Sequence, residues 1–111
     1  MAVRHIVMFG VKEDATQEQI QAVTDGLLAL PGKIPQIKSH EVGVDLKLPS
    51  GQNHPAGKNR VIVWTADFAS EADYEVYGGH PDHVACITNF IKPIMAPGSR
   101  AAIQYRRSSK L

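Results

Sequence analysis

The sequence has little that would mark a secreted, membrane-spanning or nucleic-acid-binding protein. Its one cysteine, Cys86, excludes an internal disulfide and is typical of a reducing compartment. The 12 Lys and Arg residues nearly balance the 11 Asp and Glu residues, which disfavours a general nucleic-acid-binding surface. No stretch approaches the roughly 20 apolar residues of a membrane span, and nothing resembles a signal peptide. We therefore expect a cytoplasmic protein with no nucleic-acid or membrane partner.

The 111 residues are enough for a single domain, 1–111, with one hydrophobic core. Residues 3–9 alternate and are rich in β-branched side chains, which predicts a strand. His5 lies on one face of this strand, and its companions there are Val3, Val7 and Phe9. The opposite face carries Ile6 and Met8, so that both faces of the strand are apolar.

A helix is predicted next. Thr16-Gln17-Glu18-Gln19 has the form of a capping box, in which a threonine and a glutamine three residues later pair with each other's backbone. Apolar residues then recur at helical spacing: Ile20, Val23, Leu27 and Leu30. Pro31-Gly32 is expected to end this helix.

Two further strands are predicted in the middle of the chain, over Ile37–Val44 and Arg60–Phe68. The segment Lys47–Asn59 between them is rich in proline, glycine, asparagine and charge, which indicates a long loop. In the second of these strands one face is expected to carry Ile62, Trp64, Ala66 and Phe68.

The last part of the chain predicts two short helices and a strand. Ser70 begins an S-x-x-D helix start, Gly78-Gly79 ends that helix, and Pro81 suits the first turn of another. The expected apolar stripe of this third helix is Val84, Ile87, Ile91 and Ile94. A strand is predicted over Ala101–Tyr105, followed by a tail from Arg106 to Leu111 that we expect to be frayed.

The predicted order β-α-β-β-α-α-β matches the ferredoxin-like layout, an α+β fold in which an antiparallel sheet carries its helices on one face. The other face of the sheet would then leave apolar side chains in water. Burying apolar surface gains about 25 cal/mol per Å², so a second subunit is the natural cover. We therefore expect a homodimer packed sheet to sheet.

The segment Y-G-G-H-P-D-H-V at residues 77–84 carries the candidate chemistry. Pro81 places His83 in the first turn of a helix, and Tyr77 ends the preceding helix, so that the two side chains can meet at one cavity. Three interpretations follow from the residues. In the first, His80 caps the helix and His83 is a surface side chain. In the second, His80 and His83 bind a metal together with His5. In the third, the Tyr77 phenol and the His83 imidazole transfer protons.

The chain resembles the stress-responsive dimeric A/B barrel family over most of its length. The resemblance rests on M-A-V-R-H-I-V at the start, I-P-Q-I-K after the first helix and Y-G-G-H-P-D-H-V before the third. It implies a ferredoxin-like protomer that pairs sheet to sheet into a dimeric α+β barrel.

The plant polyketide cyclases of this family imply a more specific function. By resemblance to them, Tyr77 and His83 are the catalytic pair of an aldol-type lyase that cyclises a linear poly-β-ketide thioester. No cofactor and no metal are implied, because the substrate is already activated. By the same resemblance His5 and His80 line or support the cavity. The apolar residues expected to line it are Val7, Phe9, Val23, Leu27, Trp64 and Ile87.

Two other functions remain open from the sequence. A non-catalytic, stress-associated dimer predicts an interior filled by side chains such as Trp64, Phe9 and Phe68. A haem-handling enzyme is the other, because related barrels bind haem through a histidine. It predicts a Soret band after haem is added, and this band should be lost when His83 or His5 is replaced by alanine.

Overall fold

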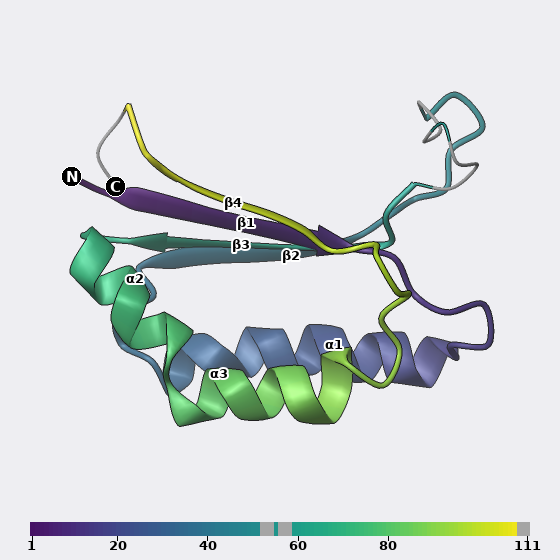
Figure 1. Cartoon of the computed structure of the whole chain (residues 1–111), viewed down its shortest axis with the longest axis horizontal. Helices are drawn as coiled ribbons and strands as arrows, with labels where there is room; N and C mark the ends of the chain where they lie inside the picture. The colour runs from purple at the N-terminus through teal and green to yellow at the C-terminus, as the bar shows by residue number, and fades with distance from the viewer. Residues whose placement is uncertain (52–54, 56–58, 109–111) are drawn as a thin grey trace.

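The computed structural model describes residues 1–51, 55 and 59–108, and it has a sheet with helices on one of its faces (Figure 1). The elements are β1 (Val3–Phe9), α1 (Gln17–Ala29), β2 (Ser39–Val44), β3 (Ile62–Phe68), α2 (Glu71–Gly78), α3 (Pro81–Cys86) and β4 (Ala101–Arg106). The four strands are antiparallel and lie in the order β2-β3-β1-β4. This is the ferredoxin-like α+β fold that the sequence predicts.

The predicted boundaries differ only at strand ends. β2 begins two residues later than predicted, because Ile37 is buried in the core before the strand starts. β3 begins at Ile62 rather than Arg60, and β4 runs one residue past Tyr105. The described residues of the loop 47–59 form no helix or strand, and the last three residues of the predicted tail lie outside the described part of the chain.

The capping box of α1 forms as predicted. The Thr16 hydroxyl accepts a hydrogen bond from the Gln19 backbone N–H at 3.1 Å, and the Gln19 side-chain oxygen accepts one from the Thr16 backbone N–H at 2.9 Å. Two of the helix's otherwise unpaired N–H groups are satisfied in this way. A 3-10 turn over Leu30–Gly32 follows the helix. The apolar residues predicted for the helix are all buried: Ile20, Val23, Leu27 and Leu30.

The side of the sheet that faces the helices holds the core. His5 pairs with Ala66 across β1 and β3, and the alternation of both strands sends one set of side chains toward the helices. Those side chains are buried, as the sequence predicts: Val3, His5, Phe9, Ile62, Trp64, Ala66 and Phe68.

The opposite side of the sheet, here called the outer face, has no helix over it (Figure 1). Ile6 pairs with Ile103 across β1 and β4 on this face, and Met8 pairs with Ala101. Ile103 is 57% exposed, and Met8 and Tyr105 are also exposed. The protomer therefore presents apolar side chains on a sheet surface that its own helices do not cover.

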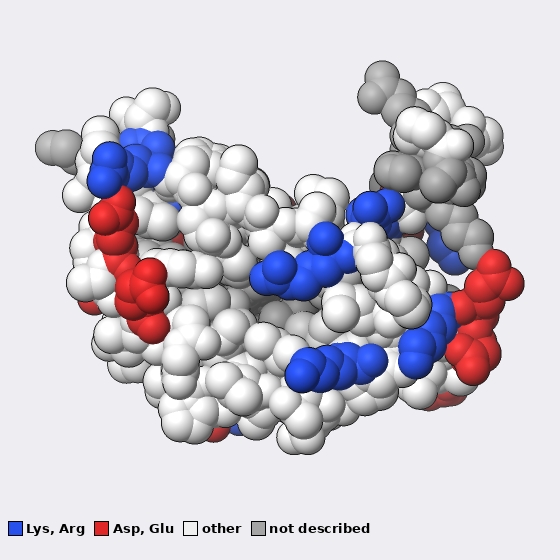
Figure 2. Space-filling model, viewed as in Figure 1, with Lys and Arg blue, Asp and Glu red and all other residues white. Residues whose placement is uncertain are grey.

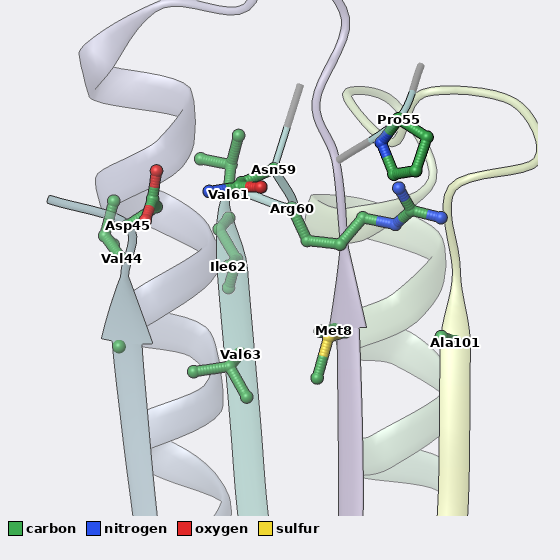
Figure 3. A pocket seen from close by; sticks show the side chains of 11 residues that line it. Met8, Val44, Asp45, Pro55, Asn59, Arg60, Val61, Ile62, Val63 and Ala101 are labelled. Atoms are coloured by element: carbon green, nitrogen blue, oxygen red, sulfur yellow. The ribbon is translucent and has the colours of Figure 1, made fainter. Parts of the chain in front are cut away.

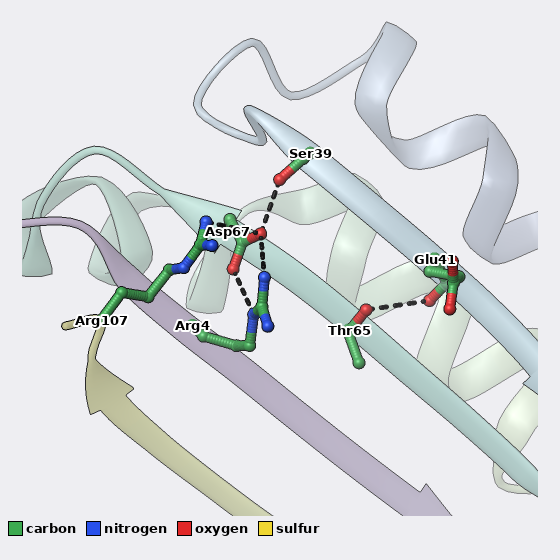
Figure 4. A network of polar contacts seen from close by, with 6 residues as sticks. All are labelled: Arg4, Ser39, Glu41, Thr65, Asp67 and Arg107. Atoms are coloured by element: carbon green, nitrogen blue, oxygen red, sulfur yellow. Dashed lines mark hydrogen bonds and ion pairs between the residues drawn. The ribbon is translucent and has the colours of Figure 1, made fainter. Parts of the chain in front are cut away.

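A polar network lies at one end of the outer face (Figure 4). The Arg4 guanidinium donates to both carboxylate oxygens of Asp67, at 2.8 and 3.0 Å, and Ser39 donates to the same carboxylate at 2.6 Å. Arg107 adds a longer contact of 3.4 Å. The Arg4 hydrogen bonds hold the pKa of Asp67 below its usual value. The network joins three strands and the segment after β4 at one buried carboxylate.

The third helix departs from the predicted stripe. After α3 the chain continues in a π-helical turn over Ile87–Ile91, where the Lys92 N–H bonds to the Ile87 carbonyl five residues back at 2.8 Å. This turn takes up one extra residue, so that Ile94 falls on the face of Cys86 rather than on that of Val84. Cys86 and Ile94 are accordingly buried, whereas Val84 is 48% exposed. The prediction that Val84 faces the core was wrong.

Within the part of the chain that the structure describes, no helix has the length and apolar character needed to cross a bilayer.

Candidate functional site

The structure brings Tyr77 and His83 into contact in the layer between the sheet and the helices. Tyr77 lies in the last turn of α2, and His83 lies in the first turn of α3. Their rings stack with centroids 4.1 Å apart and planes tilted by 30°. Phe68 of β3 packs on the same tyrosine ring, with centroids 5.0 Å apart. The chain turns between the two helices at Gly79 and His80, where the His80 backbone N–H bonds to the Tyr77 carbonyl at 3.1 Å.

The Tyr77 hydroxyl is buried and paired. It accepts a hydrogen bond from the Trp64 indole N–H at 3.0 Å, and the residue as a whole is only 1% exposed. Burial raises the pKa of Tyr77, because the phenolate would lose its hydration. The phenol therefore stays protonated at neutral pH. Since its oxygen is the acceptor in the bond from Trp64, its own O–H can be donated to another group.

The hydrogen bond of His83 fixes which ring nitrogen carries the proton. His83 Nδ1 lies 3.1 Å from the backbone carbonyl of Gly78, which can only accept, so Nδ1 is the protonated nitrogen of the neutral ring. Burial lowers the pKa of His83. The imidazole is therefore neutral at pH 7, and its Nε2 has a free lone pair that can take a proton.

A second buried imidazole adjoins this pair. His5 of β1 lies with its ring centroid 5.6 Å from that of Tyr77 and 5.4 Å from that of Tyr74. Its Nδ1 is 2.8 Å from the Gln104 side-chain oxygen, and the two residues are register partners across β1 and β4. Burial lowers the pKa of His5 as well. The cluster is thus made of neutral rings at pH 7.

The other predicted histidine, His80, has a local structural role. It is the N-cap of α3, where its Nδ1 accepts a hydrogen bond from the Asp82 backbone N–H at 3.1 Å. The side chain is also 3.7 Å from the Asp82 carboxylate. His80 therefore helps to fix the start of the helix that carries His83, and its described side-chain contacts are to Asp82.

The six apolar residues predicted to line a cavity differ in burial. Four of them are buried in the core: Phe9, Val23, Leu27 and Trp64. Val7 is only partly buried and packs against that core, and Ile87 is also only partly buried.

Two surface pockets illustrate where the protomer is hollowed. One, of about 440 Å³, lies between α2 and β4 and is lined in part by Tyr74 and Gln104, which both contact His5. A larger one, of about 640 Å³, lies on the outer face and is lined by Met8, Val63 and Ala101 among others (Figure 3). Neither pocket is lined by Tyr77 or His83.

Sequence reasoning missed three residues of this site. It placed Trp64 in an apolar lining but not as the donor to Tyr77, and it did not identify Gln104 or Arg100 at all. Arg100 lies just before β4, and its positive charge lowers the pKa of both His5 and His83. The only available signal was the alternation of the last strand, which places residues 100 and 104 on one side.

No group of three or more His, Cys, Asp or Glu side chains converges as a metal site would require, within the described residues.

Comparison with known proteins places this fold and site in context. The model of the family described as Stress responsive A/B Barrel Domain matches residues 3–106. A dimeric ferredoxin-like protein of unknown function from Thermobifida fusca is 33% identical, with a TM-score of 0.78 over 95% of this chain and 90% of that one. A similar dimeric protein from Bacteroides fragilis is 28% identical, with a TM-score of 0.73 over 96% of each chain.

A plant enzyme shares the fold at lower identity. The hydroxynitrile lyase of Passiflora edulis is 23% identical, with a TM-score of 0.79 over 97% of this chain and 95% of that one. No curated protein sequence matches the chain.

Proposed function

The chain belongs to the stress responsive A/B barrel domain family, and from that premise we propose that it is a cofactor-free polyketide cyclase. One observation carries this proposal. A neutral imidazole with a free Nε2 is stacked at 4.1 Å on a tyrosine whose protonated hydroxyl has its own O–H to donate. Such a pair can remove a proton from an acidic carbon and donate a hydrogen bond to a carbonyl oxygen.

The proposed reaction is an intramolecular aldol cyclisation of a linear poly-β-ketide thioester. His83 Nε2 takes a proton from a methylene group between two carbonyls, which leaves an enolate. The enolate carbon attacks a distant carbonyl carbon, so that one carbon–carbon bond forms and the carbonyl oxygen becomes an alkoxide. Tyr77 donates a hydrogen bond to that oxygen as negative charge develops on it. The proton that His83 took from the methylene group is then transferred to the alkoxide oxygen. The cyclic alcohol is an isomer of the substrate.

The surroundings of the pair support these roles. The indole N–H of Trp64 holds the Tyr77 oxygen in place and draws electron density from it, which makes the phenol a better donor. Apolar side chains surround the cluster and strengthen such hydrogen bonds by excluding water. Because Tyr77 is almost fully buried, the proposal requires the substrate to approach it past His83, which stacks on it and is only partly buried.

The Passiflora edulis neighbour is named a hydroxynitrile lyase, so the fold that it shares with this chain is compatible with catalysis. That likeness concerns the fold and assigns no role to any residue here.

An assay of product identity tests the proposal. A 3,5,7-trioxooctanoyl thioester cyclises without enzyme to a lactone by carbon–oxygen bond formation, whereas the proposed reaction closes a carbocycle. Liquid chromatography with mass spectrometry separates the two products. We expect the purified protein to accumulate the carbocycle at a rate proportional to its concentration. A product mixture unchanged from the enzyme-free control would exclude this activity and would favour the non-catalytic alternative.

We also propose that the protein is a homodimer formed through its outer face. Apolar side chains there reach the solvent in the protomer, since Met8, Ile103 and Tyr105 are exposed and Ile6 is only partly buried. These are the side chains that a second sheet would cover. The Thermobifida and Bacteroides neighbours are described as dimeric, which supports this assembly. The Tyr77–His83 pair lies on the other side of the sheet, so such a dimer would not cover it.

Ile103→Asp is expected to weaken this dimer at least about tenfold, because a carboxylate would be desolvated at the interface. Size-exclusion chromatography with light scattering measures the result. The wild-type protein should have a mass near twice 12.1 kDa, and the variant should fall toward 12.1 kDa at protein concentrations at least about tenfold higher than the wild-type protein does. Leu28→Asp is the matched control, since Leu28 is 48% exposed on α1, away from the outer face. A wild-type monomer would contradict the proposal.

A further inference from the structure

Arg100 is a cation beside the candidate site that the proposed chemistry does not use. It directly precedes β4, in which Ala102 pairs with Val7 and Gln104 pairs with His5. Residue 100 precedes Ala102 by two positions and Gln104 by four, so the alternation of the chain places it on the same side of the sheet as Val7 and His5. In keeping with this position, its positive charge adds to the larger effect of burial in lowering the pKa of His5 and of His83. Arg100 therefore lies on the side of the catalytic pair.

Arg100 also differs from the other arginines, because it has no partner among the described residues. Arg4 binds Asp67, Arg106 binds Glu71 at 2.7 Å, and the Arg60 Nε donates to the Ser99 carbonyl at 2.6 Å. Arg100 is exposed, and within the described ranges no carboxylate or carbonyl oxygen lies within bonding distance of its guanidinium. Its five N–H donors are thus available to a ligand.

The surface beside Arg100 is open along β4. β4 is an edge strand of the sheet, and each of its residues is exposed, including those that point toward the helices. Val7, the register partner of Ala102, is only partly buried. Figure 2 shows the surface hollowed between β4 and α3, with basic side chains at the border of the hollow. A ligand held at Arg100 would approach the helix-facing layer from this open edge.

We propose that Arg100 binds an anionic oxygen group of the substrate, so that this site takes an anionic 3-oxo acyl compound with its charge at the β4 edge and its carbonyl at Tyr77 and His83. The inference depends on the proposed function, because it uses the same pair. A planar guanidinium fits a carboxylate or a phosphate with two parallel hydrogen bonds. Fixing the charged end at the edge orients the 3-oxo group toward the buried rings.

The single tryptophan provides a probe of this binding. Trp64 is the only source of an indole N–H resonance, and that N–H donates to the Tyr77 hydroxyl. Its chemical shift in a ¹H–¹⁵N spectrum should therefore respond when a carbonyl reaches Tyr77. Acetoacetate and methyl acetoacetate share the two carbonyl carbons and differ in charge, so the ratio of their dissociation constants isolates the contribution of the anion.

We expect acetoacetate to bind at least about tenfold more tightly than its methyl ester, as charge-assisted hydrogen bonds predict. Arg100→Ala should abolish this difference by weakening acetoacetate binding alone. Arg106→Ala should retain the difference, since it removes the same charge from the same strand but from an arginine already paired with Glu71. Competition by inorganic phosphate would extend the site to phosphate esters, and its absence would restrict the site to carboxylates.

The outcomes separate this inference from the proposed function. Equal affinities of the wild-type protein for acetoacetate and its ester, or an unchanged ratio in Arg100→Ala, would overturn the role of Arg100 while leaving the Tyr77–His83 pair as a carbonyl site. If neither ligand shifts the Trp64 resonance, both the anion site and the proposed carbonyl chemistry fail.

Discussion

Replacing His83 with asparagine should lower the rate of the proposed cyclisation at least about 100-fold, the usual loss when a general base is removed. The asparagine amide N–H takes the place of Nδ1 and can keep donating to the Gly78 carbonyl, but no lone pair remains where Nε2 was. The free energy of unfolding should therefore change by less than about 1 kcal/mol. Carbocycle formation and thermal unfolding of the purified variant measure the two quantities.

The pH dependence of the same rate identifies the base. Because burial lowers the pKa of His83, the rate should rise with pH through an apparent pKa below 6.5 and then level off. The rate falls on the acid side of this pKa, called the acid limb, because only the neutral imidazole can take a proton. His40→Asn tests a histidine outside the pair, since the His40 ring lies 5.9 Å from that of Trp64, and its loss should leave the fall in rate at low pH in place. If the acid limb persists in His83→Asn, the base is another group, and buried His5 is the first candidate.

The features that sequence reasoning predicted correctly are those that depend on short-range pattern. The alternation in β1 and β3 grouped His5 with Phe9 on one face and Trp64 with Phe68 on another, and the structure confirms the grouping because all four side chains are buried. The capping box began α1 where predicted. The proximity of Tyr77 and His83 also follows from local chain geometry, because only a short turn and a helix-starting proline separate them.

The features that it missed depend on long-range register or on irregular helix geometry. Gln104 reaches His5 only because β4 pairs beside β1, which brings together residues that are 99 positions apart. The π-helical turn after α3 changed which residues face the core, and no residue type in Ile87–Ile91 indicates such a turn. Arg100 was missed because of long-range register, since its position relative to His83 depends on where the last strand joins the sheet.

The hydrogen bond from Trp64 to Tyr77 leads to a second expected result, a loss of both stability and activity in Tyr77→Phe. The substitution leaves the Trp64 N–H buried without an acceptor, which costs about 1–3 kcal/mol in the free energy of unfolding. It also removes the donor to the substrate oxygen, so the cyclisation rate should fall at least about 100-fold. Chemical denaturation and the carbocycle assay measure the two losses separately.

A double-mutant cycle distinguishes the structural role of this hydroxyl from its catalytic role. Trp64→Phe removes the indole N–H and leaves a cavity. The cavity is present both in Trp64→Phe and in the double variant Trp64→Phe/Tyr77→Phe, so its cost cancels when these two are compared. The unpaired N–H is absent once Trp64 is replaced, so Tyr77→Phe should then cost about 1–2 kcal/mol less in unfolding free energy. The loss of activity, in contrast, should remain at about 100-fold in the Trp64→Phe background, because the phenol acts on the substrate directly. If activity instead follows stability across all four proteins, Tyr77 supports the fold and does not take part in the chemistry.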